Sequence, residues 1–169
     1  MKNIQLTCAH ALVKFLIAQK TLIDGKKVPL FPGVFGIFGH GNVACLGQAL
    51  QENQKDLPTW RGHHEQNMAL TGIAYSRSKR RRQIFIATSS VGPGSTNMVT
   101  AAAVAMSNRI PILFLPGDTF ANRLPDPVLQ QVEHFNNPTM TVNDAFKPVT
   151  RYFDRITRPE QIISSLQQA

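Results

Sequence analysis

Short apolar runs alternate with segments of helical apolar spacing along most of the chain. Strands are predicted at residues 34–38, 57–61, 83–88 and 110–116, and helices at 42–53, 65–79 and 95–106. Strict alternation of this kind is typical of an α/β fold with three layers, α/β/α, around a mostly parallel sheet. Ligands of such folds gather at the carboxyl ends of the strands.

The two ends of the chain add further elements. Leu6, Ala9, Val13 and Leu16 recur at helical spacing with Thr7 as a cap, and Asp24-Gly25 with two prolines then predicts a loop, so residues 1–32 form a helix and loop within the domain. Beyond residue 118 the pattern predicts two short helices, a strand and a last helix capped by Thr157 or Arg158, at 127–134, 141–146, 149–153 and 159–168.

Length and charge narrow the class of protein. A chain of 169 residues with 43% hydrophobic residues fits a single soluble domain. The formal net charge of +8 centres on Lys79-Arg80-Arg81-Arg82, where cations complement the end of a helix. Because no aromatic residues are interleaved with these cations, we expect no nucleic-acid binding. The excess charge is also explained if the chain is a piece of a larger protein whose remainder carries compensating acids.

Cysteine usage and hydropathy indicate a cytoplasmic protein. Cys8 and Cys45 lie in helical segments without metal-type spacing, which predicts buried, reduced thiols. His10 and Lys14 interrupt the apolar residues near the N-terminus, so no export signal is expected. The longest apolar run, 110–115, is too short to span a bilayer, and we expect no membrane association.

Three blocks of residues carry the candidate chemistry. They are Gly62-His63-His64-Glu65, the stretch 89–97 with Gly92-Pro93-Gly94 and Asn97, and 111–118. The first places Glu65 at a strand-to-helix corner, where a carboxylate is also favoured simply as a helix cap. The glycines of the second block permit close backbone approach, and Asn97 is a possible cap of the following helix.

Taken in order, G-x-H-E, A-T-S…G-P-G-x-T-N and P-I-L…G-D, these blocks resemble the pyrimidine-binding (PYR) domain of thiamine-diphosphate enzymes of the acetohydroxyacid synthase group. Four stretches are similar to one branch of that group, the trihydroxycyclohexane-dione hydrolases of inositol catabolism, also labelled malonic semialdehyde oxidative decarboxylases. They are residues 37–42, 62–66, 126–133 and 155–161.

The resemblance implies a role for each candidate residue. Glu65 would hydrogen-bond to N1′ of the cofactor's aminopyrimidine ring and favour the imino tautomer, whose nitrogen takes the C2 proton. The other residues on the cofactor side would be His40, Gly41, Asn42, Gly92 and Asn97. The parent enzyme would cleave a C–C bond of the cyclic dione hydrolytically. Alternatives are a carboligase or decarboxylase of 2-oxo acids, and a non-catalytic α/β association module.

The sequence also contains two patterns that could belong to other binding sites, one for a dinucleotide and one for a metal ion. Residues 39–44 satisfy the dinucleotide fingerprint G-x-G-x-x-A. The acidic residue that should bind the ribose about twenty positions later is absent, because Thr59, Trp60 and Arg61 stand there. Arg61 could contact the 2′-phosphate of NADP, but the sequence favours the thiamine-diphosphate site over an NADP site. His63 and His64 are adjacent and lack a third ligand nearby in sequence, so no metal site is expected.

In the resembled family the diphosphate and Mg²⁺ are held by a second domain with a G-D-G motif and a later asparagine, and this sequence contains neither. Residues 1–169 are therefore expected to be the N-terminal domain of a larger enzyme, inactive alone. The resemblance also implies a homo-oligomer, at least a dimer, in which the cofactor contacts the diphosphate-binding (PP) domain of a second subunit.

Overall fold

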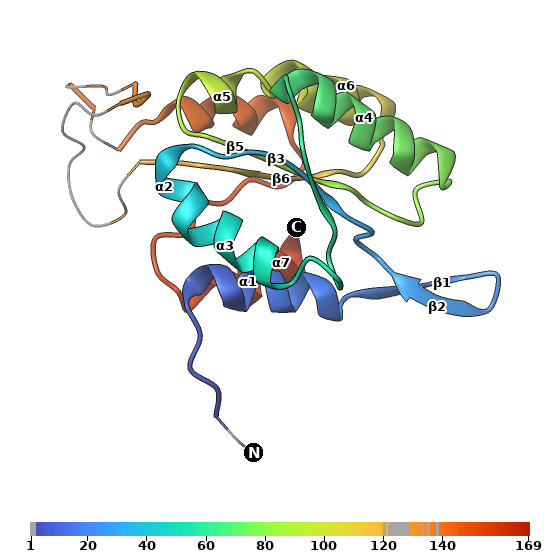
Figure 1. The fold of residues 1–169 in the computed structure, drawn as a ribbon. Helices are drawn as coiled ribbons and strands as arrows, with labels where there is room; N and C mark the ends of the chain where they lie inside the picture. Colours follow the sequence, from blue (N-terminus) through green and yellow to red (C-terminus); the bar gives the residue numbers. More distant parts are fainter. Residues whose placement is uncertain (1–2, 120, 122–128, 133, 135, 138) are drawn as a thin grey trace.

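The core of the structure is a parallel sheet of four short strands. The computed structural model describes residues 3–119, 121, 129–132, 134, 136–137 and 139–169. Its parallel strands lie in the order β4-β3-β5-β6 (Figure 1). Their bounds are Val34–Ile37 for β3, Thr59–Arg61 for β4, Ile86–Ser89 for β5 and Leu113–Pro116 for β6. Each predicted strand of this sheet is confirmed, with ends that differ by up to three residues.

Helices cover both faces of the sheet, which confirms the predicted three-layer α/β/α fold (Figure 1). On one face lie α1 (Cys8–Ala18), α2 (His40–Asn42), the π-helical η1 (Val43–Gly47), α3 (Gln48–Glu52) and α7 (Gln161–Gln168). On the other lie α4 (Glu65–Ser78), α5 (Pro93–Thr96), α6 (Val99–Asn108) and the 3-10 helix η2 (Val142–Val149).

Two apolar clusters hold these layers together. On the α1 face, Val13 and Leu16 pack with Leu50, Leu57 and Ile86. On the α4 face the cluster joins α4, β5, α6 and η2, and its buried members are Met68, Ala69, Ile73, Ala87, Met98, Ala101, Ala102, Ala105, Ile110 and Phe146. The alanines of α6 leave little side-chain volume between helix and sheet, so α6 packs closely. The two clusters fix the strand ends at which the candidate residues lie.

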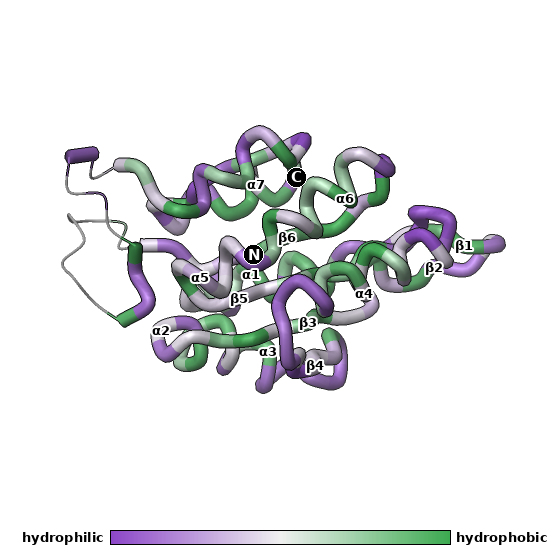
Figure 2. The backbone as a smooth tube through the Cα atoms, turned by 90° about the horizontal axis from the view of Figure 1, so that it is seen from above, coloured by the Kyte–Doolittle hydropathy of each residue, from purple (hydrophilic) through white to green (hydrophobic). Residues whose placement is uncertain are grey.

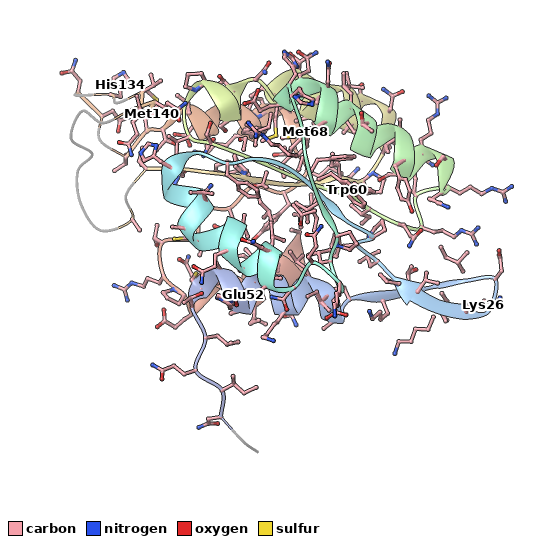
Figure 3. The ribbon with its side chains drawn as sticks, viewed as in Figure 1. Lys26, Glu52, Trp60, Met68, His134 and Met140 are labelled. Carbon is pink, nitrogen blue, oxygen red and sulfur yellow. The ribbon has the colours of Figure 1, made fainter. Side chains whose placement is uncertain are left out.

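Helix α1 is joined to α3 by a polar clamp. The Thr7 side chain caps α1 as predicted and also contacts His10 Nδ1 at 2.7 Å. His10 Nε2 lies 2.8 Å from Glu52 Oε2, and Gln48 Nε2 donates to Glu52 Oε1 at 3.0 Å. Figure 3 shows Glu52 beside α1. The hydrogen bonds from Gln48 and His10 lower the pKa of the Glu52 carboxyl below its ordinary value.

Because of this polar clamp, we expect part of the free energy of unfolding to be lost at acid pH. Because the pKa of Glu52 is lower in the folded chain, its contribution is present above pH 4.5, the ordinary value, and is lost as the pH falls below it. We therefore expect the melting temperature of Glu52→Gln to fall less steeply with acidification than that of the wild type. Thermal melts at a series of pH values test this, with the exposed Asp56→Asn as control. Identical acid limbs for the wild type and Glu52→Gln would contradict it.

Residues 20–29 form a β-hairpin where a loop was predicted. β1 (Lys20–Ile23) pairs antiparallel with β2 (Lys26–Pro29). The turn between them places Asp24 at φ 50° and Gly25 at φ 79°, the left-handed pair that a tight hairpin turn requires and that Asp-Gly favours. The loop prediction was wrong because it used this dipeptide only as a helix terminator.

The C-terminal part differs from the prediction in three places. Residues 150–157 form no strand, although Val149 and Phe153 pack against the core. The helix expected at 141–146 is present as η2, but α7 begins at Gln161 rather than near Pro159. Instead of a Thr157 cap on the helix, the Gln161 side chain accepts hydrogen bonds from the Thr157 and Arg158 backbone N–H groups.

Two further expectations concern single segments. The helix expected at 127–134 lies partly outside the described residues, and within it residues 129–130 form a turn and 131–132 have no regular structure. Cys8 and Cys45 are free, as expected, but both are exposed, so the prediction that they are buried was wrong. Among the described residues no helix combines the length and apolarity needed to cross a bilayer.

Candidate functional site

Glu65 lies at the corner between β4 and α4. The backbone leaves β4 at Arg61 and turns, with His64 in an extended conformation as the N-cap of α4. The His64 ring accepts a hydrogen bond from the Asn67 N–H at 3.4 Å, so the cap of this helix is the histidine. The carboxylate of Glu65, the first residue of α4, makes its contacts elsewhere, which sets aside a mere capping role.

Asn97 holds the Glu65 carboxylate. Its side-chain Nδ2 donates to Glu65 Oε2 at 2.8 Å, across 32 residues of sequence. The same nitrogen lies 3.5 Å from His64 Nε2. Asn97 ends α5, and α6 begins after Met98 without a side-chain cap, so the predicted capping role of Asn97 is wrong. Its amide is used to fix one carboxylate oxygen.

A hollow opens beside the pair. It has a volume of about 480 Å³ and is lined by Glu65, Ser90, Pro93, Gly94, Thr96, Asn97 and Gln130. A Cβ at Gly94 would lie 3.2 Å from Glu65 Oε1 and 2.2 Å from Ser90 Oγ. The missing side chain therefore leaves room for the second carboxylate oxygen at the wall of the hollow. Glu65 is half-buried and faces this space.

Gly92 gives the turn before α5 its shape. Its φ of 63° and ψ of −122° belong to a region that only glycine occupies readily. A Cβ there would also meet the Gln130 carbonyl oxygen at 1.8 Å. Gly92 therefore has a backbone role, in bringing the segment with Gln130 against the end of β5.

The turn after β3 lies next to the same loop but outside the lining of the hollow. Asn42 Nδ2 donates to the Ser89 carbonyl oxygen at 3.3 Å, which ties this turn to the end of β5. His40 and Gly41 are exposed, and a side chain at Gly41 would meet nothing within 4 Å. Of the six predicted site residues, the structure brings Glu65 and Asn97 together at the hollow and places Gly92 and Asn42 behind it.

Ser90 and Gln130 also line the hollow, although neither was among the six predicted site residues. Gln130 lies within the helix expected at 127–134, and only the tertiary fold shows that it reaches the loops after β3 and β5. The Gln130 side-chain oxygen is 3.6 Å from the point that a Cβ atom would occupy if Gly39 carried one. For Ser90 a signal existed, since it lies two residues before the glycine turn at the carboxyl end of a strand.

A second hollow, of about 290 Å³, lies on the other side of the start of α4. Its lining is Phe35, Arg61, Gly62, His63, His64, Asn67, Met68 and Thr71. The described residues contain no group of three or more His, Cys, Asp or Glu side chains placed to hold a metal ion. His64 is taken up as a helix cap.

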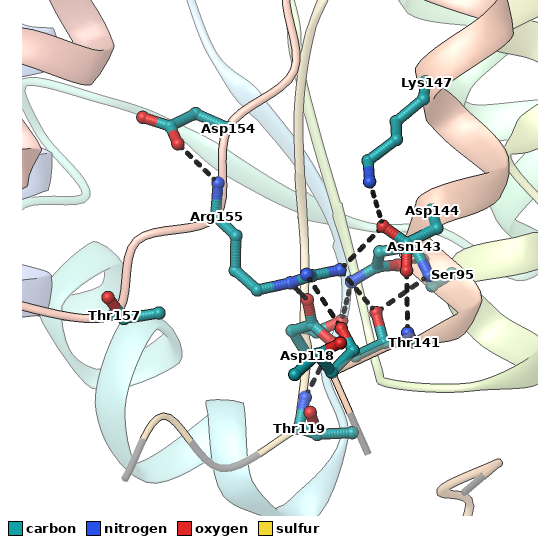
Figure 4. Close-up of polar contacts among 12 residues, drawn as sticks. Ser95, Asp118, Thr119, Thr141, Asn143, Asp144, Lys147, Asp154, Arg155 and Thr157 are labelled. Carbon is teal, nitrogen blue, oxygen red and sulfur yellow. Dashed lines mark hydrogen bonds and ion pairs between the residues drawn. The ribbon is translucent and has the colours of Figure 1, made fainter. Parts of the chain in front are cut away.

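Behind the first hollow, a polar network fixes α5 and the loop after β6 (Figure 4). Ser95, buried on α5, donates to the Asn143 side-chain oxygen, and Asn143 Nδ2 donates to the Gly117 carbonyl oxygen at 2.8 Å. Arg155 binds Asp118 through Nε at 2.8 Å and Asp144 through Nη2 at 3.2 Å. The carboxyl ends of β5 and β6 are thus held in a fixed relation.

Comparisons with known proteins identify a family for this chain. Residues 32–138 match the family described as "Thiamine pyrophosphate enzyme, N-terminal TPP binding domain". Curated proteins named 3D-(3,5/4)-trihydroxycyclohexane-1,2-dione hydrolase are 55% identical in Shouchella clausii, 54% in Geobacillus thermodenitrificans and 53% in Bacillus subtilis. Each match covers at least 99% of this chain and 26% of the relative.

These relatives carry the name of the branch that the four sequence stretches resemble. The resemblance to that branch is therefore confirmed. The chain spans about a quarter of the length of these curated relatives. The family match includes the start of α4, the segment from the end of β5 through α5 to Asn97, and Gln130, which together supply the residues that line the hollow around Glu65. The chain belongs to the thiamine pyrophosphate enzymes, in the family of their N-terminal TPP-binding domain.

Proposed function

We propose that this chain is the cofactor-activating domain of a thiamine-diphosphate enzyme that hydrolyses a C–C bond of trihydroxycyclohexane-1,2-dione in inositol catabolism. The observation that supports the site most directly is the Glu65 carboxylate, which faces a hollow at the carboxyl end of the sheet and is not used as a helix cap. The proposed substrate class rests on the names of curated relatives at 51–55% identity.

The residues around the hollow fit an aminopyrimidine ring. A carboxylate can share a proton with a ring nitrogen, and Gly94 removes the side chain that would otherwise fill the space beside Oε1. The half-buried position of Glu65 limits competition from water. When bound, thiamine diphosphate supplies a carbon nucleophile that can add to a carbonyl group.

This chain's own residues have separate tasks in the proposal. Glu65 holds or releases a proton at Oε1, the oxygen next to Gly94, while Asn97 fixes Oε2. Fixing one oxygen restricts rotation of the carboxylate and orients the other, which favours proton transfer in a defined direction. Ser90 and Gln130 complete the polar wall, and Gly92 shapes the turn that carries it.

The parent protein supplies the rest. Residues 1–169 would be its N-terminal pyrimidine-binding domain, with residues 1–32 as the N-terminal helix and hairpin. We propose that another part of the parent holds Mg²⁺ and the diphosphate, and that the cofactor lies between this domain and the PP domain of a second subunit in a homodimer. The isolated chain would be inactive. Two free cysteines fit a cytoplasmic location.

The pyrimidine site can be tested on this chain alone. We expect 4-amino-5-hydroxymethyl-2-methylpyrimidine to bind weakly, with Kd in the millimolar range, about −4 kcal/mol. Heteronuclear NMR titration should show shifts of Glu65, Gly94 and Asn97 amides. The variant Gly94→Ala should abolish them because its Cβ would occupy the space between Ser90 and Glu65.

Ala18→Ser, at an exposed position of α1 on the opposite face of the sheet, is the control. It should titrate like the wild type. Shifts confined to the second hollow around His63, or titration unaffected by Gly94→Ala, would contradict the assignment of the first hollow to the pyrimidine ring.

A further inference from the structure

We propose that the end of the domain opposite the candidate site is a docking surface for an acidic surface of the parent polypeptide. This surface, the basic end, consists of the β1–β2 hairpin (residues 20–29), residues 77–82 at the end of α4 and Arg109 after α6. It holds nine of the eighteen Lys and Arg residues of the chain and one of its ten acids, Asp24. The net charge of the chain, +8, therefore equals that of the basic end, because the other nine cations and nine acids balance.

Tertiary contacts bring these segments together. Arg82 Nη1 lies 3.2 Å from Asp24 Oδ1, which links the end of α4 to the hairpin turn. Gln83 Nε2 donates to the Pro29 carbonyl oxygen at 2.8 Å, and Arg81 Nη2 donates to the Asn108 carbonyl oxygen at 3.4 Å. Figures 1 and 2 show the hairpin projecting from the domain beside the end of α4, and Figure 2 colours much of both segments purple, for hydrophilic residues.

Eight of the nine cations of the basic end belong to exposed residues, and Arg82 is half-buried. Lys26 extends away from the body of the domain (Figure 3). Arg80 and Arg81 are exposed, and both have the left-handed backbone, with φ of 54° and 62°, which L residues adopt at a cost. The one acid of this surface, Asp24, is already paired with Arg82. Like charges crowded in this way repel one another, so an anionic partner would relieve a cost that the free domain bears.

One face of the hairpin is open to solvent. Among the described residues, β1 and β2 form strand pairs with each other alone, and the Leu22 side chain is 69% exposed. An isolated two-stranded hairpin is at best marginally stable in water. A surface that covers Leu22 and places carboxylates near Lys26 and Lys27 would stabilise it through both apolar burial and charge pairing.

The balance of charge decides between possible partners. A second copy of this chain brings the same basic end and no excess of acids elsewhere, so it is not complementary. Nucleic acid is disfavoured because the rings beside this surface, Tyr75 and Phe85, pack against one another with centroids 4.9 Å apart instead of forming a stacking platform. Relatives about four times as long show how much further polypeptide can supply the acidic surface.

Hydrogen exchange of the parent protein, followed by mass spectrometry, tests the docking. Amides of the hairpin should be protected in the wild type. In Lys26→Glu/Lys27→Glu/Arg80→Glu they should exchange roughly tenfold faster, as expected when three exposed charge pairs are lost. The control Lys14→Glu/Lys55→Glu/Arg158→Glu makes the same change of charge at exposed positions elsewhere and should exchange like the wild type.

Unchanged exchange in α4 and α6 verifies that the variants are folded, and Leu22→Ser gives a second route to the same loss of protection. Equal, fast hairpin exchange in the wild type and the triple variant would overturn the proposal. So would protection that appears only after addition of oligothymidylate. Because the measurement needs no cofactor, its result is independent of the function proposed for Glu65.

Discussion

Glu65→Gln in the parent enzyme is expected to slow hydrogen exchange at the cofactor's C2 by about 10²–10⁴-fold, the usual range for loss of a positioned acid–base group. The amide keeps the size of the side chain and can still accept a hydrogen bond from Asn97 through its oxygen. It cannot take up and release a proton, which is the task proposed for Oε1. The effect should therefore be chemical and not structural.

Proton exchange at C2, followed by NMR after quenching, measures this step without dependence on the substrate. Glu52→Gln, on α3 at the face of the sheet opposite α4 and α5, is the control and should exchange at the wild-type rate. Thermal melting of Glu65→Gln should match the wild type within about 0.5 kcal/mol, the usual range for substitutions that keep the packing. An undiminished exchange rate would remove Glu65 from the catalytic machinery.

The sheet and its layers could be predicted because each strand is a short apolar run between helical segments. β5 is buried at all four positions, which is why its sequence reads as continuous hydrophobic and small residues. The prediction of a strand at 149–153 was wrong, because strand formation depends on pairing with a neighbouring strand, which the local sequence pattern does not reveal. Val149 and Phe153 do face the core, but the backbone there pairs with no neighbouring strand.

At the candidate site, residue type and local position predicted Glu65 but not its partners. Asparagine is a common helix cap, so the sequence predicts a capping role for Asn97. Only the fold shows that its side-chain amide instead donates a hydrogen bond to Glu65, 32 residues earlier in the sequence. The sequence alone does not show that the His64 ring caps α4. Gln130 reaches the hollow through tertiary packing alone.

Arg155→Met is expected to destabilise the domain by about 2–4 kcal/mol, because it removes several charge-assisted hydrogen bonds, takes the Arg155 cation from Asp118 and leaves Asp144 with Lys147 alone. The Arg155 side chain is 28% exposed, and those of Asp118 and Asp144 are 22% and 19% exposed. Arg155 Nη2 also donates to Thr141 Oγ1 at 2.9 Å (Figure 4). Urea denaturation measures the loss, and the exposed Arg151→Met is the matched control.

The same substitution should change the dependence of stability on pH. Partial burial alone would raise the pKa of Asp144, but hydrogen bonds from Lys147 and the Thr141 backbone, with the charge of Arg155, lower it overall. A lowered pKa stabilises the fold above the ordinary value of 3.8, and this contribution is lost as the pH falls. In Arg155→Met the Asp144 pKa lies nearer that value, so the acid limb of the stability curve should be shallower. An acid limb as steep as that of Arg151→Met would mean that Lys147 and the Thr141 backbone suffice to hold the carboxylate.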